Sequence, residues 1–179
     1  MRRALDGWAP WSRAALRLLS VRHPEVIRRV GLIATNGMIE ADIYGNVNST
    51  NVSGSRIMNG IGGSGDFTRN GYVSSFITPS LAKDGAISAI VPFASHIDYT
   101  EHDVMVVISE HGFADLRGLA PRDRVKKMIA IAAPEYRPLL EEYYERATSG
   151  DNKFMQTPHD LATAFDFHRN LLSTGSMRG

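Results

Sequence analysis

Three groups of residues in this sequence have types and spacings that could do chemistry. The first is a glycine-rich loop, residues 60–65, whose unhindered amide groups could approach a ligand closely. The second gathers histidines and carboxylates between residues 95 and 103, which could bind zinc or a two-metal centre. The third is Glu110, at the end of an apolar run, where a carboxylate must be hydrogen-bonded or take part in a reaction because unpaired buried charge is costly.

The glycine-rich loop could bind a dinucleotide, approach some other ligand, or be an ordinary flexible loop. Its glycines at the first, third and sixth positions match a dinucleotide-binding pattern, but that pattern needs a buried strand before it and a long helix after it. Here residues 53–59 are polar and the following segment breaks at Asn70-Gly71, so the sequence argues against NAD binding. A flexible loop and close backbone approach to a ligand stay equally open.

The other two groups also leave alternatives open. A metal-dependent hydrolase would have to use His96, Asp98, His102 and Asp103, whose spacing matches no known ligand motif, so a hydrogen-bonded polar connection is favoured. Glu110 could form an ion pair with Arg117 or another cation instead of acting in catalysis, and residue types alone do not separate the two.

The elements that must position these groups follow from periodicity and turn residues. A helix is predicted over 23–30, ended by Gly31, and a strand or hairpin over 32–48 with a turn at Gly45-Asn46. Residues 45–71 are polar, but the apolar residues embedded in them (Met58, Ile61 and Phe67) indicate order. Strands are predicted at 72–77, 87–91 and 104–108, and helices at 121–132, 139–147 and 161–172.

These elements predict an α/β fold, an open sheet flanked by helices with a helical C-terminal tail. The polar cluster after the strand at 104–108 stands where open α/β sheets bind ligands. The length of 179 residues suits one domain, and the net charge of +1 implies no nucleic-acid or membrane partner. The absence of cysteine excludes disulfides and thiolate sites and favours a reducing compartment, so we expect a cytoplasmic protein. No apolar run reaches the roughly 20 residues that span a bilayer, so we expect a soluble one.

The first 20 residues differ from the rest. Residues 1–30 hold seven arginines against only Asp6 and Glu25. An organelle transit peptide has such a composition, which leaves a mitochondrial location as an alternative, but a ragged or truncated start is preferred. We therefore expect an unmatched leader over 1–20 and a domain over 21–179.

Read together, five segments resemble the acetyl-CoA hydrolase/transferase family, which includes succinyl-CoA:acetate and 4-hydroxybutyrate CoA-transferases. They are Asn-Val-Asn-Ser-Thr-Asn-Val (46–52), Met-Asn-Gly-Ile-Gly-Gly-Ser-Gly-Asp-Phe (58–67), Ile-Val-Pro-Phe-Ala-Ser-His-Ile-Asp (90–98), Thr-Glu-His-Asp (100–103) and Ala-Asp-Leu-Arg-Gly-Leu (114–119). The resemblance covers roughly residues 23–177 and implies the carboxy-terminal domain of such an enzyme.

The resemblance also implies a mechanism and its residues. A glutamate attacks an acyl-CoA thioester and becomes a glutamyl-CoA thioester, which acetate, succinate or water then resolves. Gly63 falls at the family's oxyanion donor and contacts CoA, and Asn59 and Lys83 fall where relatives touch CoA. Glu110 matches a second active-site glutamate. CoA enters as substrate, no permanently bound cofactor or metal is expected, and the full-length form is expected to be a homodimer.

Two positions depart from the family pattern. The residue that pairs with Glu110 in relatives is an asparagine, and Arg22 stands in its place. The nucleophilic glutamate lies upstream of the matched region, since neither Glu25 nor Glu40 sits in its motif. We therefore expect this chain to need a missing N-terminal half for catalysis and to expose apolar surface without it. A non-catalytic CoA-binding or interaction fragment is the alternative.

Overall fold

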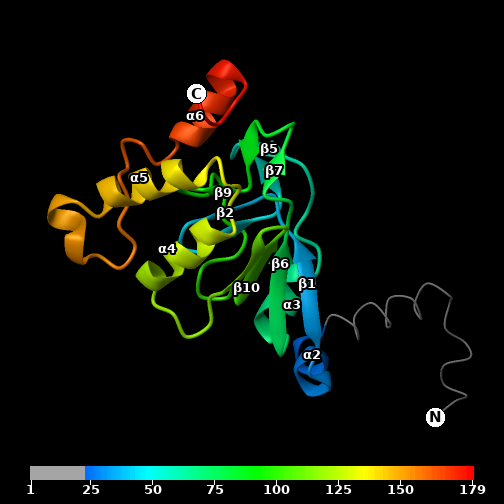
Figure 1. Cartoon of the computed structure of the whole chain (residues 1–179). Helices are drawn as coiled ribbons and strands as arrows, with labels where there is room; N and C mark the ends of the chain where they lie inside the picture. Colours follow the sequence, from blue (N-terminus) through cyan, green and yellow to red (C-terminus); the bar gives the residue numbers. More distant parts are fainter. Residues whose placement is uncertain (1–22) are drawn as a thin grey trace, which may run out of the picture.

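A computed structural model describes residues 23–179, so Arg22 and the predicted leader lie outside the described residues. The strands, interrupted by α3, lie between residues 33 and 115, and helices follow them to the C-terminus (Figure 1). The elements are α2 (Pro24–Val30), β1 (Ile33–Gly37), β2 (Glu40–Asp42), β3 (Val47–Asn48), β4 (Asn51–Val52), β5 (Arg56–Ile57), α3 (Ser64–Asn70), β6 (Val73–Ile77), β7 (Leu81–Ala82), β8 (Ile87–Ser88), β9 (Ile90–Val91), β10 (Val106–Ser109), β11 (Gly112–Asp115), α4 (Pro121–Ala130), α5 (Arg137–Ala147), the 3-10 helix η2 (Gly150–Phe154) and α6 (Asp166–Thr174).

The main sheet has four strands in the order β1-β6-β10-β11. The first three are parallel, and β11 returns antiparallel to β10 in a tight hairpin. Parallel strands need long crossovers, and here the segments between β1 and β6 and between β6 and β10 contain the smaller sheets. The strands β1, β6 and β10 therefore end at the same edge, which we call the carboxyl edge. The predicted open α/β sheet is confirmed.

Three smaller sheets lie in the crossovers. Their orders are β3-β2-β9, β4-β5 and β7-β8. The predicted hairpin over 32–48 forms as the antiparallel pair β2–β3, and Gly45 in its turn has a φ of 92°. A Cβ atom on Gly45 would lie 2.7 Å from Leu116 Cδ1, so this turn requires glycine on two grounds.

The hydrophobic core lies on one face of the main sheet. Phe76, Val107 and Ala114 point to it from β6, β10 and β11. Buried side chains of α4 and α5 complete the same cluster, which explains their three-to-four spacing of apolar residues. The helix α3 packs on this face too, because Ser74 Oγ donates a hydrogen bond of 3.1 Å to the carbonyl of Thr68.

The predicted helices are confirmed except at one start. Proline begins α2 and α4, and Gly31 ends α2 with a φ of 63°. The helix expected from residue 161 was predicted too long, since α6 begins only at Asp166. The reason is Asp160, whose carboxylate accepts hydrogen bonds from Ala162 N and Thr163 Oγ1 and holds this segment in a turn. No helix among residues 23–179 is long and apolar enough to cross a bilayer.

Candidate functional site

The candidate site lies at the carboxyl edge of the main sheet. The chain leaves β1 into Met38 and Ile39, and it leaves β10 into Glu110. The glycine-rich loop precedes α3, and α3 leads back into β6, which brings the loop to the end of β1. The fold thus places the loop and Glu110 where open α/β sheets bind ligands.

A cavity of about 380 Å³ lies between the end of β1 and the glycine-rich loop. Ten residues line it, namely Asn36, Gly37, Met38, Ile39, Ser49, Met58, Asn59, Gly60, Ile61 and Ser64. The predicted residue Asn59 is among them, and Gly63 is the N-cap of α3 directly before the lining residue Ser64. Met58 and Ile61 are 65% and 45% exposed, and they contribute to the wall of this cavity and not to the core.

A second cavity, of about 730 Å³, adjoins the first. Its walls come from β2, the hairpins β4–β5 and β7–β8, and the end of α6 with the residues after it. The lining residues are Met38, Ile39, Glu40, Val52, Ser53, Ser55, Arg56, Met58, Thr78, Ala82, Lys83, Ile87, Ser88, Leu171, Leu172, Gly175 and Met177. Met38, Ile39 and Met58 line both cavities. The predicted residues Asn59 and Lys83 therefore lie on two adjoining parts of one elongated site.

A buried polar network supports the first cavity. Asn48 donates from Nδ2 to Glu40 Oε1 at 3.0 Å, and its Oδ1 accepts from the amides of Thr50 and Asn51. Asn59 then donates from Nδ2 to the carbonyl of Ser49 at 2.6 Å. The asparagine-rich segment over 46–52 is thus a scaffold that fixes the loop carrying Asn59, since a fully paired polar network rigidifies its surroundings.

Glu40 connects this network to the C-terminal helix. Its Oε1 accepts from Ser95 N and Oγ at 2.7 and 2.6 Å, and its Oε2 lies 2.8 Å from His168 Nε2. The side chains of His168 and Glu40 are only 6% and 5% exposed. Burial raises the pKa of Glu40, but the hydrogen bond and charge of His168 and the donors Ser95 and Asn48 outweigh it and hold the pKa below its usual value. Sequence reasoning missed this pair, whose members stand 128 residues apart.

Glu110 is held by a different partner from the one considered from sequence. Its carboxylate accepts from Ser80 N at 2.8 Å and from Ser80 Oγ at 2.6 Å, and its side chain is 50% exposed. The hydrogen bond from the Ser80 hydroxyl lowers the pKa of Glu110, with the Ser80 amide and the charge of His111 adding to it. The alternative ion pair with Arg117 is wrong, because Arg117 binds Asp115 through Nε and Nη2 at 2.9 and 2.8 Å.

The metal-binding alternative is not supported by the geometry. Asp98 accepts hydrogen bonds from Ser49 N and Thr50 Oγ1, and Asp103 pairs with Arg69 at 2.8 Å. Across residues 23–179 no group of three or more histidines and carboxylates could hold a metal ion. Asp98 and Asp103 instead hold neighbouring segments by hydrogen bonds, in agreement with the hydrogen-bonded polar connection that the sequence favoured. The glycine loop likewise lacks the dinucleotide setting, since α3 has only seven residues.

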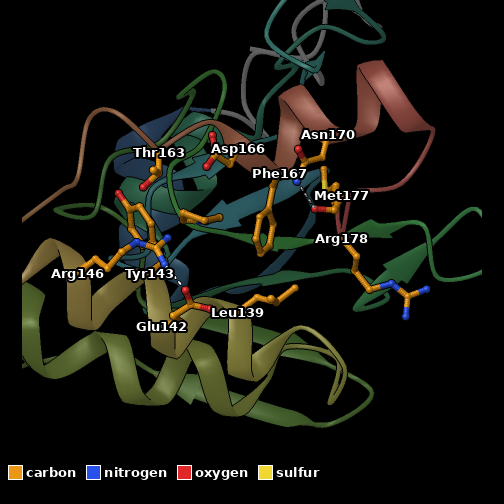
Figure 2. A pocket seen from close by; sticks show the side chains of 11 residues that line it. Leu139, Glu142, Tyr143, Arg146, Thr163, Asp166, Phe167, Asn170, Met177 and Arg178 are labelled. Carbon is orange, nitrogen blue, oxygen red and sulfur yellow. Dashed lines mark hydrogen bonds and ion pairs between the residues drawn. The ribbon is translucent and has the colours of Figure 1, made fainter.

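Two other cavities lie away from the carboxyl edge, among the C-terminal helices. One, of about 140 Å³, lies between α5 and α6. Figure 2 shows the ion pair of Glu142 with Arg146 and the hydrogen bond from Asn170 to the carbonyl of Met177 among its lining residues. That volume is below the roughly 300 Å³ at which ligand pockets begin. A groove of about 520 Å³ between α4 and α5 is lined mainly by charged side chains around Ile129 and Tyr144.

Comparison with known proteins agrees with the resemblance. Residues 13–144 match the family model described as the acetyl-CoA hydrolase/transferase C-terminal domain. Succinyl-CoA:acetate CoA-transferase of Clostridium kluyveri is 54% identical, with 87% of this chain and 29% of the relative covered. Acetyl-CoA hydrolase of Candida albicans is 47% identical, with 97% and 35% covered. The chain thus spans about a third of the length of the curated relatives it matches.

Solved structures agree at the level of the fold. RipA from Yersinia pestis aligns with a TM-score of 0.60 at 26% identity, covering 70% of this chain and 28% of that one. A 4-hydroxybutyrate CoA-transferase from Porphyromonas gingivalis aligns with a TM-score of 0.54 at 31% identity, covering 70% and 30%.

Proposed function

Because the chain belongs to the acetyl-CoA hydrolase/transferase family, as its C-terminal domain, we propose that it supplies the CoA-binding part of an acyl-CoA:carboxylate CoA-transferase or acetyl-CoA hydrolase. Relatives with both names are about equally similar, so the proposal covers both reactions. The whole activity is proposed for a longer protein, of which this chain spans about a third. We propose the cytoplasm as its compartment and a homodimer as the full-length form on the family resemblance alone.

The observation that carries this proposal is the pair of adjoining cavities at the carboxyl edge. CoA is long, with an apolar arm that ends in a thiol and a phosphorylated nucleotide at the other end. The shared wall of Met38, Ile39 and Met58 suits the arm, and Lys83 and Arg56 line the larger cavity with two cations that suit phosphates. Asn59 offers an amide to the smaller cavity, where the thioester would lie.

The proposed reaction splits one acyl exchange into easier steps. A glutamate carboxylate attacks the thioester carbonyl, and CoA thiolate leaves from the resulting oxyanion to give an acyl-glutamyl anhydride. The thiolate then attacks the glutamyl carbonyl, which releases the first carboxylate and forms the glutamyl-CoA thioester. A second carboxylate or water reverses the sequence or hydrolyses the thioester. We assign the Gly63 amide as donor to the oxyanion, because a preorganised donor stabilises charge as it forms.

The contacts of the glutamates support a nucleophile from outside residues 23–179. Glu40 has hydrogen-bond partners on both oxygens, and Glu25 pairs with Arg29 on the surface of α2. We assign Glu110 to the second active-site glutamate, where its lowered pKa keeps it ionised and Ser80 fixes its direction. Because the chain spans a third of its relatives, a CoA-binding fragment without catalysis of its own is the second candidate.

Calorimetric titration of the purified chain with CoA tests the proposal. Lys83→Ala should weaken binding about tenfold, since a hydrogen bond to a charged group contributes about 1.5 kcal/mol or more. Gly63→Trp should abolish binding by filling the cavity beside the loop. Lys153→Ala, on η2 away from the cavities, is the matched control and should change the Kd less than about twofold. A folded chain that binds no CoA, or whose affinity is unchanged by Lys83→Ala, contradicts the proposal.

A further inference from the structure

One face of the main sheet is open to solvent. Residues that lie opposite each other in the register point to the same face, and this face carries six apolar side chains. They are Ile33, Val73, Ile77, Val106, Ile108 and Phe113. Val106 is buried, at 9% exposed. Ile33 and Phe113 are each 72% exposed, and Ile77 is 48% exposed. We call these six residues the open face.

The packing of the helices explains why the open face is uncovered. The helices α3 and α4 pack on the opposite side, where Ser74, Phe76, Val107 and Ala114 point. Parallel sheets occur almost only with both faces covered, because their strands are apolar on both sides. Ile33, Val73 and Ile77 therefore belong to strands built for a second layer, and single exposed apolar residues would not need that explanation.

The length of the curated relatives indicates what covers the open face. The curated relatives are about three times as long as the part this chain matches, and the matching family model is that of a C-terminal domain, so the remainder precedes it. The helix α2, which leads into β1, packs on α3 on the opposite side of the sheet and so leaves the open face uncovered.

We propose that the open face is the docking surface for the N-terminal part of the longer polypeptide of this family. The face continues to the carboxyl edge, since Ile77 is the last residue of β6 and Phe113 lies three residues after Glu110. A layer docked there ends next to Glu110, so it completes the site as well as the sheet. This inference rests on the proposed membership of a longer protein but not on CoA binding, so the two can fail separately.

The cysteine-free sequence makes a direct labelling test possible. A chimera is made in which this chain replaces the matching C-terminal third of the Escherichia coli relative, propanoyl-CoA:succinate CoA transferase, which is 52% identical. Ile33→Cys and Phe113→Cys place one thiol at each end of the open face. The rate of maleimide labelling is measured by mass spectrometry of the peptide that carries each thiol, in the isolated chain and in the chimera.

At both positions, labelling in the chimera should be at least tenfold slower than in the isolated chain. The control is Phe154→Cys on η2, a side chain 83% exposed, which should label at the same rate within twofold in both proteins. Equal rates for Ile33→Cys and Phe113→Cys in the two proteins would overturn the inference. So would an insoluble chimera beside a soluble isolated chain, because the N-terminal part would then not accept this face. A tight dimer of the isolated chain that protects both thiols would assign the face to a second copy instead.

Discussion

The buried pair of Glu40 and His168 gives the sharpest prediction about the fold. His168→Leu removes the only side-chain donor to Glu40 Oε2 within residues 23–179 and leaves a carboxylate inside the protein. Breaking a buried pair from one side costs about 3–5 kcal/mol. Glu40 keeps Ser95 and Asn48 on its other oxygen, which places the expected loss near the lower limit, at about 3 kcal/mol.

Urea unfolding of four proteins measures the effect: wild type, Glu40→Gln, His168→Leu and the double variant. The double-mutant cycle should give a coupling energy of about 1–3 kcal/mol. The matched control is His102→Leu, because this histidine also lies near a glutamate, Glu101, at 3.3 Å, but is 82% exposed. Its cost should stay below about 0.5 kcal/mol.

The pH dependence of the unfolding free energy tests the same pair independently. The folded-state pKa of Glu40 lies below its usual 4.5, so its contribution to stability is full above pH 4.5 and is lost as the pH falls below that value. The difference in unfolding free energy between wild type and Glu40→Gln should shrink in that acid range. A cost of His168→Leu no larger than that of the His102→Leu control would refute the account of how α6 is held.

Three further predictions concern other parts of the chain. Burial lowers the pKa of His159 to about 4 from 6.5, so the unfolded state gains its proton first and stability should fall as the pH drops from 6.5 towards 4. Because the ring is partly exposed, we expect a loss of about 1–2 kcal/mol in the free energy of unfolding between pH 7 and pH 5. Urea unfolding at the two pH values measures this loss, and it should be absent in His159→Phe. Gly45→Ala should cost about 2–4 kcal/mol by the same assay, since φ is 92° and the new Cβ would meet Leu116 at 2.7 Å; wild-type stability would contradict this. Ser80→Ala should raise the pKa of Glu110 towards its ordinary value in an NMR titration of the carboxyl carbon, and an unchanged pKa would show that Ser80 does not control it.

Local patterns were sufficient to predict much of the fold. Proline at the starts of α2 and α4 and Gly31 at the end of α2 act within one helical turn, so their positions are readable from the sequence. The strand β10 could be predicted because its side chains are apolar on both faces of the sheet. The domain boundary at residue 21 stays a prediction.

What could not be predicted depends on contacts between distant residues. Glu40 meets His168, and Ser80 meets Glu110, only after the chain has folded, and no spacing rule connects such residues. The late start of α6 depends on one side chain, Asp160, that captures backbone and hydroxyl donors in place of a helix. Of the site residues, Asn59 and Lys83 line adjoining cavities, while the catalytic roles of Gly63 and Glu110 stay proposals.

The most direct test of the central claim is to map CoA on the chain by NMR. Amide shifts of the labelled 179-residue chain are followed as CoA is added. We expect the shifts to concentrate at Ile39, Asn59, Gly63 and Lys83, at the carboxyl edge, and to saturate with one affinity. Shifts confined to the groove between α4 and α5, or no shifts in a folded chain, would contradict the assignment of the two cavities to CoA.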